Sequence, residues 1–244
     1  MPRKLEITGQ TPNAGLMFEG KAAVSDNIEG NPSTRRMYVV DEFWYDSQAN
    51  YTVTLDGTND AVAAIAGGVK GLSLLSGDTD NQVSYFATGL IFDVSNNPEI
   101  EGRFTLTDIS QTSFFFGFSD AVTGTTPHST IDYADATLAA ASTDAVGFVS
   151  DADKESSLLY AAQIATGGAV AAQSSGVTPV ENTEVVLRVK LVGTTATFYV
   201  NNNVVATKAA AVTDVPLCLM VNFGTRDGGG GDAIYMKRLQ MWQD

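Results

Sequence analysis

Pairs of carboxylates on one strand face are the first chemistry to look for in this chain, because two acids flanking a bond can cleave a glycoside. Glu99 and Glu101 stand two residues apart, so on a strand their side chains share one face. No acid follows on Phe104–Leu106 to extend that pair, and a strand points Asp41 and Glu42 to opposite faces. The spacing of the acids therefore predicts no glycosidase site.

Other catalytic groups are scarce in the sequence. The single histidine, His128, has Ser129 beside it, but adjacent residues rarely form a nucleophile–base pair, and no Gly-x-Ser-x-Gly elbow occurs. The single cysteine, Cys218, lies in an apolar run and is expected to be a small buried hydrophobe. One cysteine and one histidine cannot form a tetrahedral zinc site. We therefore predict no catalytic, cofactor-binding or metal-ligating residue, and no enzyme.

Two acid-rich segments could still bind Ca²⁺. Asp78–Asn81 and Asp151–Asp153 place side-chain oxygens close together in expected loops, and oxygens are the ligands that Ca²⁺ takes. The first segment lacks the glycine and the glutamate that an EF-hand loop places at its sixth and twelfth positions. Turns rich in Asp and Asn also form for backbone reasons alone. A bound Ca²⁺ is the alternative to the prediction of no cofactor.

Exposed aromatic rings beside polar groups could bind a sugar. Trp44 and Tyr45 alternate on an expected strand, so one of them faces solvent, and Tyr133 lies in the long polar segment 120–143. Each ring could instead belong to a core, because aromatic side chains dominate protein cores. Trp44 and Tyr133 remain the candidate glycan contacts.

The elements that position these residues are strands, and the pattern is clearest in the carboxyl-terminal third. Val185, Leu187 and Val189 alternate with polar neighbours, which is the period of a sheet with one buried face. Asn201–Asn203 predicts a tight hairpin turn, because Asn tolerates positive φ. The strands expected here are Thr183–Leu191, Thr194–Val200, Asn203–Thr207, Leu217–Gly224 and Ala233–Trp242.

Earlier parts of the chain continue the series at the spacing typical of a β-sandwich. Phe114–Phe118 is apolar on both faces, which predicts a central strand covered on each side. Ala61–Val69 is rich in Ala and Gly and predicts a short helix or a loose turn. The other expected strands are 37–45, 51–55, 71–76, 82–86, 90–94, 99–106, 113–119, 145–150, 157–164 and 169–173.

Composition and charge divide the chain of 244 residues into an arm and a body. Residues 1–36 hold five of the fourteen basic residues and few apolar runs, which predicts an extended amino-terminal arm before a single domain over 37–244. The net charge of −14 disfavours nucleic-acid binding, since phosphates would be repelled. No run of 18 apolar residues and no signal-peptide core occur, so we expect no membrane span and no secretion signal.

The strand order resembles the concanavalin A-like jelly roll of lectins and glucanases. The resemblance covers about residues 37–244 and rests on EGRFTL (101–106), FFFGFSD (114–120), AVGFVSD (145–151) and the hairpin around NNN (201–203), followed by a last strand with Trp. It implies an all-β sandwich of two antiparallel sheets. Members that cut β-glucans carry Glu-x-Asp-x-x-Glu on one strand, a pattern missing here. The fold hosts unrelated functions, so it does not assign one.

The function expected from these features is structural. The composition resembles that of bacteriophage virion proteins, and it predicts a non-enzymatic capsid decoration or cement protein on the outer capsid surface, made in the host cytoplasm. Its partner would be the major capsid protein or another virion protein, and a homo-oligomer, with a trimer as one form, is expected. The predicted capsid contacts are Arg3, Lys4, Leu5, Ile7, Arg35 and Arg36. The alternative is a lectin-like module on a tail fibre or cell surface that recognises host glycans.

Overall fold

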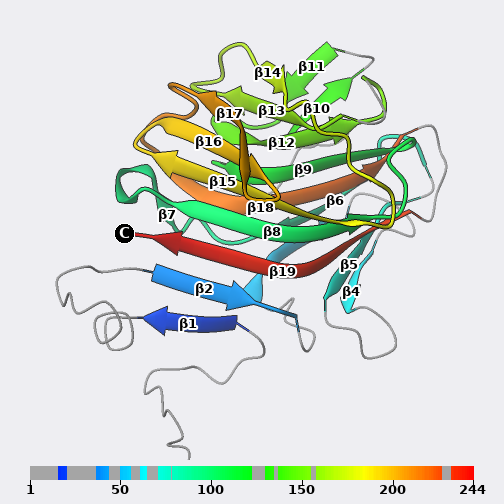
Figure 1. Cartoon of the computed structure of the whole chain (residues 1–244), viewed down its shortest axis with the longest axis horizontal. Coiled ribbons are helices and arrows are strands. Elements are labelled where there is room, and N and C mark those ends of the chain that lie inside the picture. Colours follow the sequence, from blue (N-terminus) through cyan, green and yellow to red (C-terminus); the bar gives the residue numbers. More distant parts are fainter. Residues whose placement is uncertain are drawn as a thin grey trace, which may run out of the picture.

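The computed structural model describes ten parts of the chain, and nearly all of them are strand (Figure 1). A short 3₁₀ helix, Val94–Asn96, interrupts them. None of the described helices is long and apolar enough to cross a membrane. The described ranges are 16–20, 37–43, 50–55, 61–64, 71–77, 79–122, 130–134, 137–154, 158–226 and 232–244.

Sheet A has nine antiparallel strands and carries the last strand of the chain near its middle. In Figure 1 its strands follow one another upward from β1 through β2, β19, β8, β15 and β16 to β17. Two shorter strands, β5 and β4, continue beside the first half of β19. The bounds are β1 Leu16–Gly20, β2 Met37–Asp41, β19 Ala233–Gln243, β8 Glu99–Leu106, β15 Glu184–Val192, β16 Thr195–Val200, β17 Asn203–Lys208, β5 Leu72–Leu75 and β4 Ala61–Ala64.

Sheet B has eight antiparallel strands in the order β14-β13-β12-β9-β18-β6-β3, with β7 paired to the start of β18. A separate hairpin, β10–β11, comes from the segment between β9 and β12. The bounds are β14 Ala171–Ser174, β13 Tyr160–Ile164, β12 Ala145–Asp151, β9 Thr112–Ser119, β18 Pro216–Thr225, β6 Val83–Ala87, β3 Thr52–Leu55, β7 Phe92–Asp93, β10 Ile131–Ala134 and β11 Thr137–Ala140.

The main core lies between the two sheets and is built from every second residue of each strand. Phe104 of β8 packs edge-on against Phe114 and Phe116 of β9, with ring centroids 5.2 and 4.9 Å apart. Phe148 of β12 meets Phe198 of β16 at 5.3 Å in the same manner. These contacts join the sheets into the all-β jelly-roll sandwich that the sequence predicts.

A second core covers the other face of sheet B. Phe115 of β9 and Met220 of β18 are fully buried there, together with Ile131 and Tyr133 of the β10–β11 hairpin. All eight residues of β9 are buried, which confirms the prediction of a central strand with two covered faces. The β10–β11 hairpin, part of the segment 120–143 that was expected to be a polar excursion, thus covers this face.

Close backbone packing occurs beneath the second core. Gly117 of β9 and Gly147 of β12 are directly opposite in the ladder, and the ring of Phe115 lies over both. A Cβ atom on Gly117 would lie 2.2 Å from the Val146 carbonyl oxygen, so only glycine fits.

Three features of the chain path bear on the elements expected from the sequence. Asn201 and Asn202 have positive φ of 49° and 67°, which confirms the predicted Asn hairpin turn between β16 and β17. The region 61–64, expected to be a helix or turn, is strand β4 paired to β5. Within the predicted arm, β1 pairs antiparallel with β2 at the edge of sheet A.

Candidate functional site

The outer face of sheet A, turned away from the core, carries aromatic and charged side chains from five neighbouring strands. Strand alternation explains this arrangement: on β15, Leu187 and Val189 are buried in the core, so Arg188 and Lys190 point outward. We call this face the sheet A platform. Its side chains are Tyr38, Glu99, Glu101, Arg103, Glu184, Arg188, Lys190, Tyr199, Lys237, Arg238, Gln240 and Trp242.

The ladder register aligns these side chains in rows across the strands. In the first row, Tyr38 is opposite Trp242, Trp242 is opposite Glu99, and Glu99 is opposite Lys190. The two aromatic rings lie 6.4 Å apart at an interplanar angle of 59°. The Trp242 side chain acts to lower the pKa of the neighbouring Glu99 carboxyl. One end of the row is therefore an aromatic pair beside a carboxylate.

Glu99 is the carboxylate that the platform buries, with 6% of its surface exposed. Arg188 Nη1 lies 3.3 Å from Glu99 Oε1, and Lys190 Nζ lies 3.6 Å from Oε2. Burial raises the pKa of Glu99 above its ordinary value, and the charges of Lys190 and Arg188 oppose that rise without cancelling it. Glu99 thus organises the cations around it.

The second row places a stacked cation beside polar groups. Gln240 is opposite Glu101, Glu101 is opposite Arg188, and Arg188 is opposite Tyr199. The guanidinium carbon of Arg188 lies 3.9 Å from the centroid of the Tyr199 ring, a cation–π contact. With its amide oriented to satisfy its neighbours, Gln240 accepts from the Tyr38 hydroxyl at 2.9 Å and donates to Glu101 Oε1 at 3.2 Å.

A separate ionic cluster is buried between sheet B and the β10–β11 hairpin. Arg226, just after β18, is fully buried, and its guanidinium donates to Asp151 Oδ1 at 3.0 Å and Oδ2 at 2.8 Å. It also donates to Asp132 of β10 at 3.2 Å and to the side chain of Asn81. Burial acts to lower the pKa of Arg226, but Asp151 and, more weakly, Asp132 and Asp153 outweigh it and raise the pKa.

This cluster bears on the predicted Ca²⁺ ligands. Asn81 from the first acid-rich segment and Asp151 and Asp153 from the second do converge, and the cation among them is the guanidinium of Arg226. Within the described ranges no group of three His, Cys, Asp or Glu side chains is arranged to hold a metal ion. The Asp151 carboxylate belongs instead to a hydrogen-bonded clamp on the hairpin. Binding of Ca²⁺ stays a prediction.

The remaining predicted residues have varied places. Tyr133 is 6% exposed, and its ring centroid lies 5.6 Å from that of Tyr160 in the second core. The ring is therefore a core side chain, which was the alternative to its prediction as an exposed glycan contact. Glu99 and Glu101 do share a face, as expected. The capsid contacts and several other candidates lie outside the described residues, namely Arg3, Lys4, Leu5, Ile7, Arg35, Arg36, Trp44, Tyr45, Asp78 and His128.

Cys218 is fully buried in β18, which confirms the prediction of a small core residue. Burial raises the pKa of its thiol to about 12. Its Sγ donates to the Ala121 carbonyl oxygen at 3.2 Å. The thiol is therefore held in its protonated, unreactive form at neutral pH.

The sequence-based choice of sugar-contacting rings missed the aromatic residues of the platform. Tyr38, Tyr199 and Trp242 are each half-buried on the outer face. Period-2 alternation within each strand indicates an outward direction for Tyr199, since Phe198 and Val200 are inward. The pairing of Tyr38 with Trp242 joins the two ends of the domain, so local patterns carry no signal for it.

A groove of about 390 Å³ lies beside β7 and the start of β18. Its lining includes apolar side chains of Leu90, Ile91 and Pro216 and the carboxylates of Asp93 and Asp214. Its lining side chains include no cation and no hydrogen-bonding aromatic ring. The platform offers a richer set of groups for recognition.

Comparison with known proteins identifies the fold. No family model matches the chain, and no curated protein matches it. Similar solved structures include a glycoside hydrolase family 16 endo-glucanase from Bacteroides ovatus, with a TM-score of 0.57, 10% identity and coverage of 83% of this chain and 98% of that one. The carbohydrate recognition domain of Emp47p has a TM-score of 0.56 and 12% identity, and the match covers 80% of this chain and 88% of that one. An endo-β-1,4-glucuronan lyase from Trichoderma reesei has a TM-score of 0.56 and 9% identity, and the match covers 84% of this chain and 94% of that one.

This comparison corrects one prediction. The prediction that the chain is not an enzyme is contradicted, because the similar structures include family 16 glycoside hydrolases, another glycosidic hydrolase, a β-glucanase and a lyase. At about 10% identity the likeness shows the fold alone. The chain has a concanavalin A-like jelly roll, a fold that binds carbohydrate in its glucanase and carbohydrate-recognition representatives.

Proposed function

We propose that this protein binds a polysaccharide on the sheet A platform. The observation that carries the proposal is the placement of aromatic rings at both ends of the rows, Tyr38 with Trp242 at one end and Tyr199 at the other. Between them lie hydrogen-bonding groups of Glu99, Glu101 and others. A sugar ring presents an apolar face and hydroxyl groups at its rim, and this mixture of ring faces and polar side chains matches both.

The dimensions of the platform suit a chain of several sugars better than a single one. Trp242 of β19 and Tyr199 of β16 are three strand spacings apart, about 14 Å across the sheet. Cross-strand neighbours fix the side chains between them, since Glu99 is bonded on two sides and Arg188 is stacked on Tyr199. Fixed groups lose little conformational entropy when a ligand binds, which favours affinity.

The carbohydrate-binding fold supports the proposal, because domains of this architecture recognise or process glycans. Decoration of phage heads, expected from the sequence, stays a prediction. The similar structures named above lend it no support, and its anchor residues lie outside the described ranges. A pull-down with undecorated heads, run beside the glycan experiment below, separates the two functions.

The test is affinity electrophoresis in gels that contain soluble polysaccharides, followed by titration of the retained ones. Trp242→Ala and Tyr199→Ala should each weaken retention at least about fivefold, since each removes a stacking surface worth about 1 kcal/mol or more. Val180→Ala is the matched control, because Val180 is 63% exposed and off the platform. Unchanged retention in both aromatic variants would refute the platform as the site. Reducing ends released during incubation would report hydrolysis in the same samples.

A further inference from the structure

Side chains of like charge lie next to each other on the platform, between its second row and Tyr235 of β19. Arg238 of β19 and Arg103 of β8 are directly opposite in the ladder. Like charges placed opposite each other destabilise a sheet. The register shifts between Met236 and Arg238, and this bulge lets Lys237 reach the same face. Three cations therefore meet at one point of the sheet.

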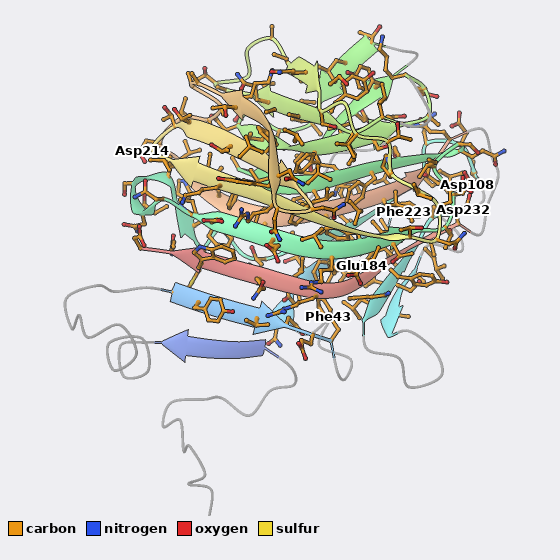
Figure 2. All side chains as sticks on the ribbon, in the orientation of Figure 1. Phe43, Asp108, Glu184, Asp214, Phe223 and Asp232 are labelled. Atoms are coloured by element: carbon orange, nitrogen blue, oxygen red, sulfur yellow. The ribbon has the colours of Figure 1, made fainter. Side chains whose placement is uncertain are left out.

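One carboxylate, that of Glu184, is shared by two of these cations. Arg103 Nη1 lies 3.6 Å from Glu184 Oε1, and Lys237 Nζ lies 3.5 Å from Glu184 Oε2. Both separations are longer than a charge-assisted hydrogen bond. Figure 2 shows Glu184 beside β19, where the bulge brings Lys237. The carboxylate therefore balances part of the positive charge and leaves an excess.

One donor of each arginine, its Nε–H group, lacks an acceptor among the described residues. The Nε atoms of Arg103 and Arg238 are shielded from solvent, and neither has a hydrogen-bond partner. Arg238 Nη2 donates a hydrogen bond to the side-chain oxygen of Gln240 at 2.7 Å. A buried donor without an acceptor costs free energy, so the two guanidinium groups are incompletely hydrogen-bonded in the folded protein.

The charge of the platform is opposite to that of the whole chain. The chain has fourteen basic residues, five of them in 1–36, which leaves nine in 37–244. Five of those nine lie on the platform, against three carboxylates, while the chain as a whole carries −14. The basic platform residues are Arg103, Arg188, Lys190, Lys237 and Arg238.

We propose that the polysaccharide is acidic, and that Arg103, Lys237 and Arg238 seat one of its carboxylate or sulfate groups. This inference rests on the proposed function. Arginine presents a planar fork of donors that matches the two oxygens of a carboxylate or sulfate. The acidic remainder of the surface repels polyanions in other orientations, so the platform directs an acidic chain to the aromatic rows.

The test uses biolayer interferometry at 50 and 200 mM NaCl with four immobilised probes. These are polygalacturonate, dextran sulfate, neutral dextran and a 30-base-pair DNA duplex. The variants are Arg103→Gln/Arg238→Gln, Lys237→Gln alone, and Lys154→Gln, which removes one positive charge next to Tyr133 in another part of the molecule. Circular dichroism and thermal unfolding check that each variant is folded.

We expect binding to polygalacturonate or dextran sulfate, and the preferred one identifies the anion. Arg103→Gln/Arg238→Gln should lose at least about tenfold in affinity, Lys237→Gln should lose a smaller factor, and Lys154→Gln should match the wild type. The thermal midpoint of the double variant should stay level or rise, because the opposed charges are gone. A merely structural pair would lower it.

Three outcomes would overturn the inference. Neutral dextran bound as tightly as the acidic polymers would reject the acidic class and leave the proposed function standing. Equal binding to DNA would show unspecific attraction of polyanions. Retention of no polysaccharide by any form of the protein would reject the proposed function itself.

Discussion

Single residues show how this protein uses burial to set its charges. Glu99 and Asp151 are carboxylates with little or no exposure that keep cations next to them, and burial raises the pKa of both. The two acids differ in purpose. Asp151 clamps Arg226 under the hairpin, whereas Glu99 orients Arg188 and Lys190 at the surface.

The raised pKa of Glu99 predicts a pH dependence of stability. The native protein binds the Glu99 proton more readily than the unfolded chain, so the free energy of unfolding falls as pH rises from the unfolded value of 4.5 through the native pKa. In Glu99→Gln this contribution disappears, and the decline over that interval should be shallower. Urea unfolding at pH 4, 5, 6 and 7 measures it. A steeper decline in the variant would contradict the assignment.

The Arg226 clamp predicts a large loss of stability. Arg226→Met leaves the buried carboxylates of Asp151 and Asp132 without their cation, which should lower the free energy of unfolding by about 3–5 kcal/mol. Arg103→Met removes a half-exposed ion pair and also one of two opposed charges, so its free energy of unfolding should stay within about 1 kcal/mol of the wild type. Chemical denaturation of both variants gives the comparison. Equal losses of unfolding free energy in the two variants would contradict the claim that burial makes the Arg226 cluster costly to break.

At the scale of elements, the β9–β12 contact is the tightest constraint on the sandwich. Gly117→Ala places a Cβ against the Val146 carbonyl oxygen and the Gly147 Cα, and backbone atoms cannot move aside cheaply. Overpacking of this kind should cost about 1–3 kcal/mol or more. Gly89→Ala, whose Cβ would meet nothing closer than 3.7 Å, should stay within about 0.5 kcal/mol of the wild type. Thermal unfolding distinguishes the two, and comparable midpoints would refute the packing argument.

Strands with a strong local pattern were predictable from the sequence, and elements made by distant pairing were not. Val185, Leu187 and Val189 form the inner face of β15 as their alternation predicts. Ala61–Ala64 has no such pattern, and its strand exists because it pairs with β5. The cover over sheet B was missed for a similar reason, since Tyr133 becomes buried only against side chains of other strands.

The candidate site depends on register, which the sequence does not reveal. Glu99 and Glu101 could be assigned to one face from their spacing alone. Their neighbours Trp242 and Arg188 come from strands on either side, separated in sequence by far more than a local pattern spans. The same holds for Arg226 and its partner Asp151, 75 residues apart. The face on which these polar side chains lie was therefore predictable from the sequence. Their alignment in rows across the sheet was not, because it depends on the pairing of distant strands.

At the scale of the whole molecule, the two sheets have different outer faces. Sheet B is covered by the β10–β11 hairpin and a second core, which closes much of that face to a large ligand. Sheet A carries partly exposed aromatic and basic side chains on its described strands. The strongly acidic chain thus has one basic, aromatic surface, and we propose that a glycan binds there.

The most direct measurement is the fluorescence of Trp242 during titration with a retained polysaccharide. The chain has two tryptophans, so Trp44→Phe leaves Trp242 as the sole indole reporter. We predict a saturable change in its emission, with a midpoint equal to the dissociation constant from interferometry, and loss of that change in Arg103→Gln/Arg238→Gln at the same glycan concentrations. Binding that saturates by interferometry while the emission of Trp242 stays constant would contradict the platform as the binding site.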